Sequence, residues 1–409
     1  MSLPKLAYLT GEYPRASDTF IQREVAALRA LGHEVTTCSI RTTGAEHLVG
    51  PEQREEHART YKVLVAAKNP LTLLRAHLRW MRQPGRYLRA LKLAWQTAPK
   101  GVKGRFYNLI YFLEAGVLAA HLAKQGVDHL HNHIAKASCT VAMLASDLSG
   151  IPYSFTIHGP DIFFEPHHWR IDEKAARATF VACISEYCRS QLMCFADQAH
   201  WDRFHIVHCG VDPDRYTPAP HRSEDTHLLF VGRLAGVKGV PILIEALRGL
   251  APDTPNLRLT IIGDGPDRAA LESQAQGLPI TFTGYQSQSE VAETLATADL
   301  FVLPSFAEGV PVVLMEAMAS YVPVITTRIA GVPELVAQGT SGLLVAPGDA
   351  SGLRDAIKAL ADDPARRLRM GAEGRAKVET EFNITREAGW LSALFRDYAA
   401  GRKPSGKRP

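Results

Sequence analysis

The chain has 409 residues, a net charge of +4 and a charged fraction of 22%. Its length predicts two or three domains, and its composition is ordinary for a globular protein, with no run of about 18 apolar residues that would span a bilayer. Six cysteines without a closely spaced pair give no zinc signature. The cysteines lie within apolar strand or helix patterns, so we expect them to be reduced and buried. Because the first residues lead straight into an apolar strand without a secretory leader, we expect a cytoplasmic protein.

Strand and helix patterns alternate through the first half of the chain, which is typical of a parallel sheet. The expected strands are residues 6–10, 34–40, 129–133, 153–157, 181–184 and 204–208. The expected helices are 19–31, 111–125, one that ends near 148, 173–180 and one that starts at 186. The pattern predicts a first doubly wound, Rossmann-like α/β domain over residues 1–210.

A basic helical insertion over residues 57–113 interrupts this alternation. It has twelve Lys and Arg residues and no Asp or Glu, and Leu, Trp, Tyr and Phe side chains lie between the basic ones. A basic amphipathic helix of this kind suits an anionic membrane surface, where each cation adds on the order of 1 kcal/mol. A solvated basic helix face is the alternative. The modest net charge and the lack of a known motif disfavour nucleic acid.

Turn residues cluster at 210–220 and predict the linker to a second domain. The strands expected after it are 228–231, 257–262, 280–283, 298–304, 322–327 and 342–345, and the helices are 240–250, 269–276, 290–296 and two that start at 350 and 364. We predict a second Rossmann-like domain over 211–384, a helix at 385–400 that packs back on the first domain, and a disordered basic tail at 401–409.

Two carboxylates stand eight residues apart, Glu308 in the loop after an apolar strand and Glu316 in the helix that follows. At roughly 100° per residue, eight helical residues return the second side chain near the direction of the first. Glu316 can accept two hydrogen bonds from a vicinal diol while Glu308 meets the ligand at the loop. A solvated helix face is the alternative, but a Gly309–Pro311 opening after a buried strand is typical of a ligand loop.

Gly232 and Arg233 follow the first strand of the second half, and Lys238 and Gly239 stand five residues further on. An Arg fork and a Lys point charge in a glycine-containing loop at a helix start can bind phosphate oxygens, with help from the free N–H groups of the helix. The motif therefore predicts a phosphate site, with a plain basic surface loop as the alternative. Hydrolytic glycosidases also use two carboxylates but need no such loop.

Together with the Gly263-Asp-Gly265 turn, these motifs resemble the retaining glycosyltransferases of family 4, and the resemblance covers nearly the whole chain. The stretch 13–21 and the His131-Asn-His133 triplet resemble the branch that includes colanic-acid and other exopolysaccharide transferases. The resemblance implies a GT-B fold, in which two Rossmann-like domains face a central cleft, and a nucleotide-sugar donor that is used without a cofactor or a metal. The Gly263 turn lacks the third glycine of a dinucleotide fingerprint, which disfavours a dehydrogenase.

The resemblance also implies roles for individual residues. Arg233 and Lys238 would hold the donor diphosphate, Glu316 the ribose and Glu308 the transferred sugar. His158, at a strand end, would lie near the sugar and assist the transition state. Further donor contacts are expected at Gly11, Gly232, Gly263, Tyr285 and the backbone of Gly309 and Val310. The expected acceptor and membrane side comprises Arg75, Arg79, Arg82, Arg86, Arg89 and His133.

These observations favour a transferase at the inner face of the cell membrane that adds a sugar to a lipid-linked glycan during surface polysaccharide synthesis. Front-face attack is preferred to a double displacement, because no carboxylate is obviously placed as a nucleophile, although Glu308 stays open as one. The alternatives are a soluble GT-B enzyme with a small acceptor and an inactive glycan-binding scaffold.

Overall fold

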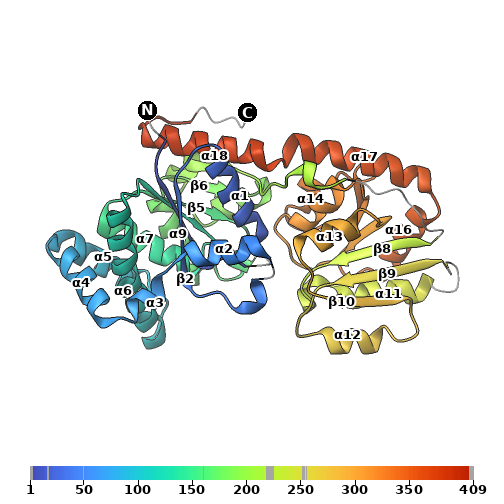
Figure 1. The fold of residues 1–409 in the computed structure, drawn as a ribbon, viewed down its shortest axis with the longest axis horizontal. Helices are drawn as coiled ribbons and strands as arrows, with labels where there is room; N and C mark the ends of the chain where they lie inside the picture. The colour runs from blue at the N-terminus through green and yellow to red at the C-terminus, as the bar shows by residue number, and fades with distance from the viewer. Residues whose placement is uncertain are drawn as a thin grey trace. The chain divides into compact units, whose positions relative to one another are not determined.

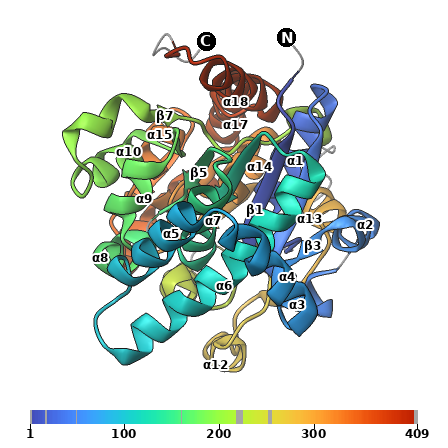
Figure 2. The same ribbon diagram turned by 90° about the vertical axis from the view of Figure 1, so that its left-hand side faces the viewer.

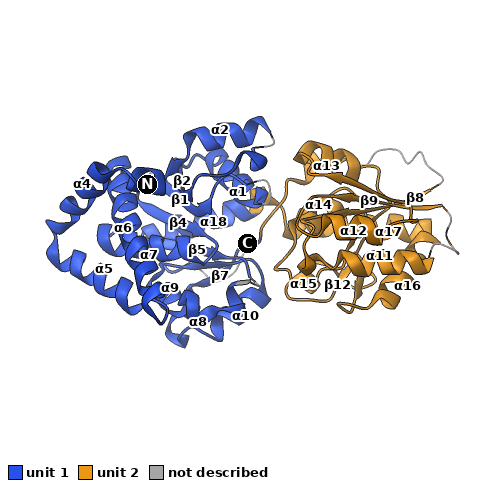
Figure 3. Cartoon of the chain, turned by 90° about the horizontal axis from the view of Figure 1, so that it is seen from below, with its two compact units in different colours: residues 1–208, 387–409 blue, residues 209–386 orange. Residues whose placement is uncertain are grey.

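The computed structural model describes residues 3–15, 18–48, 50–159, 161–217, 225–250, 254 and 256–404 (Figure 1). The chain forms two compact units (Figure 3). Unit 1 comprises residues 1–208 and 387–409, and unit 2 comprises residues 209–386. The boundaries expected from the sequence, after 210 and after 384, each lie two residues from these limits.

Unit 1 is built on a seven-stranded parallel sheet with the order β3-β2-β1-β4-β5-β6-β7. The strands are β1 (Leu6–Glu12), β2 (Val35–Arg41), β3 (Tyr61–Lys62), β4 (His129–His133), β5 (Tyr153–Ile157), β6 (Val181–Cys183) and β7 (Phe204–Ile206). The strand order reverses between β1 and β4. The carboxyl ends of these two strands therefore frame a switch point, where open α/β sheets bind ligands.

Helices cover both faces of this sheet. They are α1 (Thr19–Ala30), α2 (Pro51–Arg59), α3 (Val63–Ala67), α4 (Pro70–Met81), α5 (Pro84–Gln96), α6 (Val102–Gln125), α7 (Ala137–Ser149), α8 (Pro166–Trp169), α9 (Ile171–Arg177), α10 (Glu186–Met193) and α18 (Ile384–Ala399). From α18, Leu391 and Phe395 pack into one core with Tyr8 of β1 and Leu28 of α1. The C-terminal helix thus completes the core of unit 1, while α7 contacts β1, β4 and β5.

The basic insertion is more divided than the sequence indicates. It contains the edge strand β3 and the four helices α3 to α6, and the expected helix 111–125 is the second half of α6. Helix α4 packs on α6, helix α5 packs on α6 and α7, and the two form an outer layer of unit 1 (Figures 1 and 2). Among the described helices, α6 alone is long and apolar enough to cross a membrane, contrary to our expectation that no such run exists, and half of that stretch is buried. Its apolar composition fits a helix covered by α3, α4, α5 and α7.

Unit 2 has a six-stranded parallel sheet with the order β10-β9-β8-β11-β12-β13. Its strands are β8 (Thr226–Val231), β9 (Leu257–Ile262), β10 (Ile280–Gly284), β11 (Leu300–Leu303), β12 (Val324–Thr327) and β13 (Gly342–Val345). Its helices are α11 (Val240–Leu250), α12 (Arg268–Gln274), α13 (Gln288–Leu295), α14 (Val312–Ala319), α15 (Val332–Leu335), α16 (Ala350–Ala361) and α17 (Pro364–Glu381). The switch point lies between β8 and β11, the strands that precede the two charged motifs.

Three further expectations from the sequence concern the cysteines, the linker and the C-terminal tail. Cys194 is exposed, whereas the other five cysteines are buried, because Cys194 lies at the end of α10 rather than inside it. Part of the predicted linker, residues 218–220, and part of the predicted tail, residues 405–409, lie outside the described residues. Within the described part of the tail, Arg402 pairs with Asp397 and Lys403 with Asp202.

Candidate active site

The two charged motifs of unit 2 meet where β8 and β11 end. Lys238 Nζ lies 2.6 Å from Glu308 Oε1, and Ser305 Oγ donates a hydrogen bond of 2.6 Å to the same oxygen. The backbone N–H of Phe306 donates to the carbonyl of Val237 at 2.8 Å and ties the two loops together. The Lys238 and Glu308 side chains are only 22% and 11% exposed. The fold therefore joins a cation and a carboxylate that stand seventy residues apart in the sequence.

Glycines allow the loops of this site to approach each other. Gly239 has a φ of +65°, and a Cβ there would lie 2.1 Å from the carbonyl oxygen of Pro304. Gly263 follows β9 with a φ of +135°, and its Cβ would lie 2.0 Å from the carbonyl oxygen of Gly232. Any other residue at Gly239 or Gly263 would be strained and would collide with backbone, so the two glycines hold the loop after β8 against its neighbours.

Glu308 precedes the helix that carries Glu316. Helix α14 begins at Val312, so Glu316 is its fifth residue and Glu308 lies in a non-helical loop. The geometric argument from an eight-residue helical spacing is therefore wrong, since helical periodicity does not extend back to Glu308. Glu316 is partly buried in the second turn. The N–H groups of Gly309 and Val310 have no hydrogen-bond acceptor among the described residues, so the entrance to α14 offers donors to a ligand.

Two expected donor contacts of unit 2 lie on its surface. Arg233 is exposed, and its guanidinium group makes no hydrogen bond or ion pair with any described residue. Tyr285 follows β10 and is 57% exposed. Of the two cations in the predicted phosphate loop, the structure thus joins Lys238 to Glu308 and leaves the guanidinium of Arg233 open to solvent.

In unit 1, His158 follows β5 and belongs to a row of polar groups. His158 Nε2 lies 3.0 Å from His133 Nδ1, and His133 Nε2 lies 3.1 Å from Glu24 Oε1 of α1. Tyr8 donates a hydrogen bond of 2.6 Å to the same carboxylate oxygen. Burial, and next the neighbouring His133, hold the pKa of His158 well below its usual value. His158 is therefore neutral at pH 7, and Phe20 packs against its ring at 4.7 Å.

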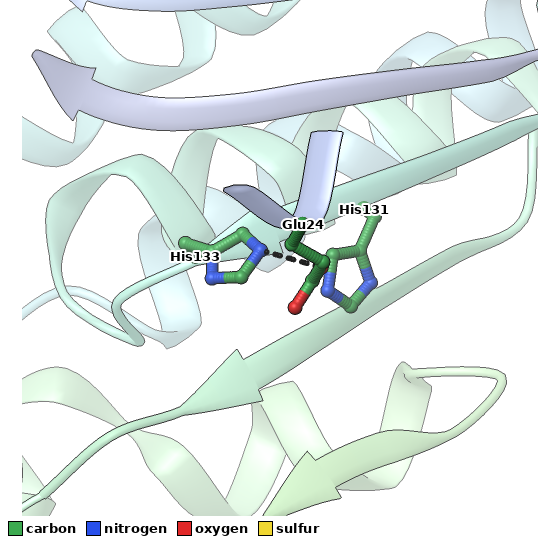
Figure 4. Close-up of side chains that lie close together, drawn as sticks. All are labelled: Glu24, His131 and His133. Carbon is green, nitrogen blue, oxygen red and sulfur yellow. Dashed lines mark hydrogen bonds and ion pairs between the residues drawn. The ribbon is translucent and has the colours of Figure 1, made fainter. Parts of the chain in front are cut away.

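The histidines of β4 lie on one face of the sheet together with polar residues of β5. His129 Nε2 and His131 Nδ1 each lie 2.7 Å from the hydroxyl of Ser154, and His131 Nε2 lies 2.8 Å from that of Thr156. Figure 4 shows His131 and His133 with the carboxylate of Glu24 between them. Glu24, His131 and His133 also form a group that could hold a metal ion, since their ligand atoms lie within 4.8 Å of one another. Our expectation of a metal-free protein stays a prediction.

The remaining contact expected in this unit is Gly11. It lies within β1, and a Cβ there would meet no atom within 4 Å, so no neighbouring group of the protein requires a glycine. Sequence reasoning missed Tyr8, Glu24 and Ser305. A signal existed for Glu24, because it interrupts the apolar stripe that α1 buries against the sheet.

Two protein-family models match the two halves of the chain. Residues 18–215 match "Glycosyltransferase Family 4", and residues 217–377 match "Glycosyl transferases group 1". The chain belongs to glycosyltransferase family 4. The amylovoran biosynthesis glycosyltransferase AmsK of Erwinia amylovora is 27% identical over 93% of this chain and 96% of its own length. The putative colanic acid biosynthesis glycosyltransferase WcaL of Escherichia coli is 28% identical over 95% and 100%.

Solved structures confirm the GT-B fold of this glycosyltransferase. Sucrose-phosphate synthase from Thermosynechococcus elongatus matches it with a TM-score of 0.76 and 20% identity, over 97% of this chain and 100% of that one. HepE from Anabaena, in complex with UDP and glucose, matches with a TM-score of 0.71 and 17% identity, over 96% and 99%. At such identities the comparison shows the fold alone.

The basic side chains of the transferase insertion fall into two groups. Arg75, Arg79 and Arg82 are exposed along α4 and its C-terminal end. Arg86 and Arg89 of α5 instead line a surface cavity of about 330 Å³. Arg177 of α9 and Asp147 of α7 line the same cavity, and Arg89 Nε lies 2.8 Å from Asp147 Oδ1. Three guanidinium groups thus line the hollow; Arg89 pairs with Asp147 and Arg177 pairs with Glu173 at 3.0 Å.

Proposed function

We propose that this transferase moves a sugar from a nucleoside-diphosphate sugar to a lipid-linked glycan in exopolysaccharide biosynthesis, with retention of configuration and without a metal. The relatives AmsK and WcaL are named for amylovoran and colanic acid biosynthesis, and HepE was solved with UDP and glucose. One observation carries the donor assignment: Lys238 contacts Glu308 beside the open N–H groups of Gly309 and Val310, at the switch point of unit 2.

The donor phosphates fit the positive groups at this switch point. In the free protein Lys238 pairs with Glu308, and a diphosphate at the start of α14 would compete for the ammonium group. The exposed Arg233 would add a two-pronged contact, and the N–H groups at the start of α14 would add hydrogen bonds. Together these groups oppose the charge that develops on the leaving phosphate, so we propose that the reaction requires no metal.

Glu308 serves best as a ligand of the transferred sugar. Its Oε1 already accepts from Lys238 and Ser305, which fixes the carboxylate in position. A fixed carboxylate can accept hydrogen bonds from sugar hydroxyls, and Glu316 can do the same for the ribose. We therefore propose front-face attack, with His158 beside the sugar, rather than a covalent intermediate on Glu308. Nuclear magnetic resonance of the first product tests retention, because inversion of the anomeric configuration would contradict this mechanism.

The insertion supports an acceptor at an anionic membrane. Leu71, Leu74, Leu78 and Met81 are each 49–56% exposed, and their spacing places them in one stripe along α4. Arg75, Arg79 and Arg82 are exposed along the same helix. An exposed apolar stripe among cations suits the headgroup region of an anionic bilayer. We propose that the protein lies peripherally at the inner face of the cell membrane.

The cavity between α5, α7 and α9 supports an acceptor that carries phosphate. Arg86, Arg89 and Arg177 place three planar guanidinium groups around it. Arg89 pairs with Asp147 and Arg177 with Glu173, while Arg86 makes no ion pair with a described residue. Guanidinium groups bind phosphate oxygens in pairs of parallel hydrogen bonds. The phosphate of a lipid-linked glycan could bind these guanidinium groups, whereas a neutral small acceptor carries no charge for them to bind.

Thermal unfolding of the purified protein tests the donor assignment. The ligands are UDP, GDP, ADP and their common sugar conjugates, each with magnesium and with a chelator. A ligand present at a hundred times its dissociation constant adds about 2.7 kcal/mol to the free energy of unfolding. We expect one nucleoside diphosphate to stabilise the protein equally in both conditions. Stabilisation only with magnesium would contradict metal independence, and no stabilisation by any nucleotide would favour an inactive scaffold.

Vesicle flotation tests the membrane assignment. We expect the protein to float with phosphatidylglycerol vesicles and to stay behind with phosphatidylcholine vesicles. The double variant Leu74→Ser, Leu78→Ser should lose this binding. Leu368→Ser on α17 is the matched control, because Leu368 is 77% exposed in unit 2. A wild-type protein that binds neither vesicle, yet hydrolyses or transfers from its donor, would favour the soluble enzyme with a small acceptor.

A further inference from the structure

A continuous line of hydrogen bonds leads from His158 into the core of unit 1. His158 Nε2 and His133 Nδ1 are 3.0 Å apart, and His133 Nε2 and Glu24 Oε1 are 3.1 Å apart. The side chains of His133 and Glu24 are 1% and 10% exposed. The line joins the residue after β5 to β4 and α1, and β1 contributes Tyr8 at its inner end. The residue expected to lie near the sugar is thus linked to a buried carboxylate.

The carboxylate sets the direction of every hydrogen bond in this line. A carboxylate only accepts, so His133 must carry its hydrogen on Nε2. If His133 is neutral, this is its one N–H, so its Nδ1 is an acceptor and the hydrogen between the two rings belongs to Nε2 of His158. We propose that Glu24 and His133 are positioning residues, which fix His158 in the tautomer with hydrogen on Nε2. This inference rests on the proposed function only for the benefit it brings to catalysis.

Tyr8 supports the acceptor role of Glu24. Its hydroxyl lies 2.6 Å from Glu24 Oε1, the same oxygen that faces His133. Burial, and next the charge of Glu24, hold the pKa of Tyr8 well above its usual value. Tyr8 therefore keeps its proton and donates a hydrogen bond to the carboxylate. Two donors converge on one oxygen, which is the arrangement expected of an ionised Glu24.

A metal ion bound by Glu24, His131 and His133 is the competing use of this cluster. The ligand atoms of the three residues lie close enough for one ion. However, both ring nitrogens of His131 already lie 2.7 Å and 2.8 Å from the hydroxyls of Ser154 and Thr156. His133 is likewise engaged at both nitrogens. An ion would have to break these hydrogen bonds, whereas the proposed line uses the contacts that exist.

The variant Glu24→Gln keeps the shape of the side chain but replaces a carboxylate, which only accepts hydrogen bonds, with an amide. An amide can donate as well as accept, so His133 can reverse both of its hydrogen bonds and leave His158 with hydrogen on Nδ1. We expect a mixture of His158 tautomers and a fall in kcat of about tenfold or more. This fall should be smaller than the roughly 10⁴-fold loss of kcat that a wrong tautomer causes in a serine protease. Affinity for the nucleotide should not change, because Arg233, Lys238 and Glu316, the side chains proposed to bind it, belong to unit 2. Tyr8→Phe is the matched control, since it removes a hydrogen bond to Glu24 and keeps the carboxylate.

Side-chain ¹H–¹⁵N correlation spectra of the full chain labelled with ¹⁵N-histidine test the inference. Replacing His133 and His158 in turn with Gln assigns their signals among sixteen histidines. In the wild type and in Tyr8→Phe we expect both rings as neutral Nε2–H tautomers, and in Glu24→Gln we expect the His158 signals to change. Hydrogen on Nδ1 of wild-type His158, or a stoichiometric metal ion in the purified protein by mass spectrometry, would overturn the proposal.

Kinetics separate the inference from the proposed function. The spectra need neither donor nor acceptor, so the tautomer assignment stands or falls even if the protein transfers no sugar. If transfer is observed, kcat should fall in Glu24→Gln while KM for the donor stays constant. A Glu24→Gln variant with altered tautomers and wild-type kcat would refute the positioning role and leave the transferase assignment intact.

Discussion

Replacing Lys238 by Met should separate the two roles of its ammonium group. Methionine keeps most of the apolar length of the side chain and removes the charge. In the free protein Glu308, only 11% exposed, then keeps Ser305 as its remaining hydrogen-bond donor among the described residues. A hydrogen bond to a charged group is worth about 1.5–3 kcal/mol, so we expect the free energy of unfolding to fall by roughly that amount. In the transition state, the loss of one preorganised charge should lower kcat by about 10²–10³, or 2.7–4 kcal/mol.

Release of the nucleoside diphosphate under donor saturation gives kcat, and thermal or urea unfolding gives the stability. The double variant Lys238→Met, Glu308→Gln should regain stability, because no buried charge is left unpaired, but it should not regain kcat. Lys377→Met is the matched control, since Lys377 pairs with Glu381 on the exposed side of α17 and should leave kcat unchanged. A Lys238→Met protein with wild-type kcat would refute the leaving-group role of Lys238.

Three further predictions concern single positions. Glu316→Gln should weaken nucleotide binding in calorimetry by about 1–3 kcal/mol while the far-ultraviolet spectrum stays unchanged. Gly239→Ala should unfold at lower temperature and lose donor binding, because its Cβ would lie 2.1 Å from the carbonyl of Pro304. Burial raises the pKa of Glu114 to about 7, despite the opposing charge of Arg41, so folding favours its protonated form. The free energy of unfolding should therefore fall as the pH rises from the ordinary pKa of 4.5 to about 7 and level off above it, and Glu114→Gln should remove this fall and gain on the order of 2 kcal/mol at pH 8.

Local patterns predict much of the fold. Helix α11 and strand β9 begin and end where their apolar periodicity indicates, at residues 240–250 and 257–262. The alternation of strand and helix also predicts two parallel sheets. It cannot predict the strand order, because neighbours in the sheet are chosen by contacts between distant segments. It also misses β3, since two residues are too few to show a period.

The site of unit 2 is more visible in the sequence than that of unit 1. Arg233 and Lys238 stand in loops among glycines, where a charged side chain is unusual enough to indicate a ligand. Even there, the joining of Lys238 to Glu308 is invisible to local reasoning, because it depends on β8 and β11 being neighbours. The helical spacing argument for Glu308 fails for a related reason, since the sequence does not show that α14 starts only at Val312.

The polar row of unit 1 is hidden because it lies on a buried strand face. In β4, His129, His131 and His133 alternate with Leu130 and Asn132, and every one of these five residues is buried. Apolar residues of similar volume could fill such a face without the cost of burying polar atoms, and replacements of this kind are often neutral or stabilising. Stability alone therefore does not explain a line of buried hydrogen bonds that ends at His158. A need to hold that ring in one orientation and one tautomer does explain it, and it explains why the inner end is a carboxylate rather than an amide.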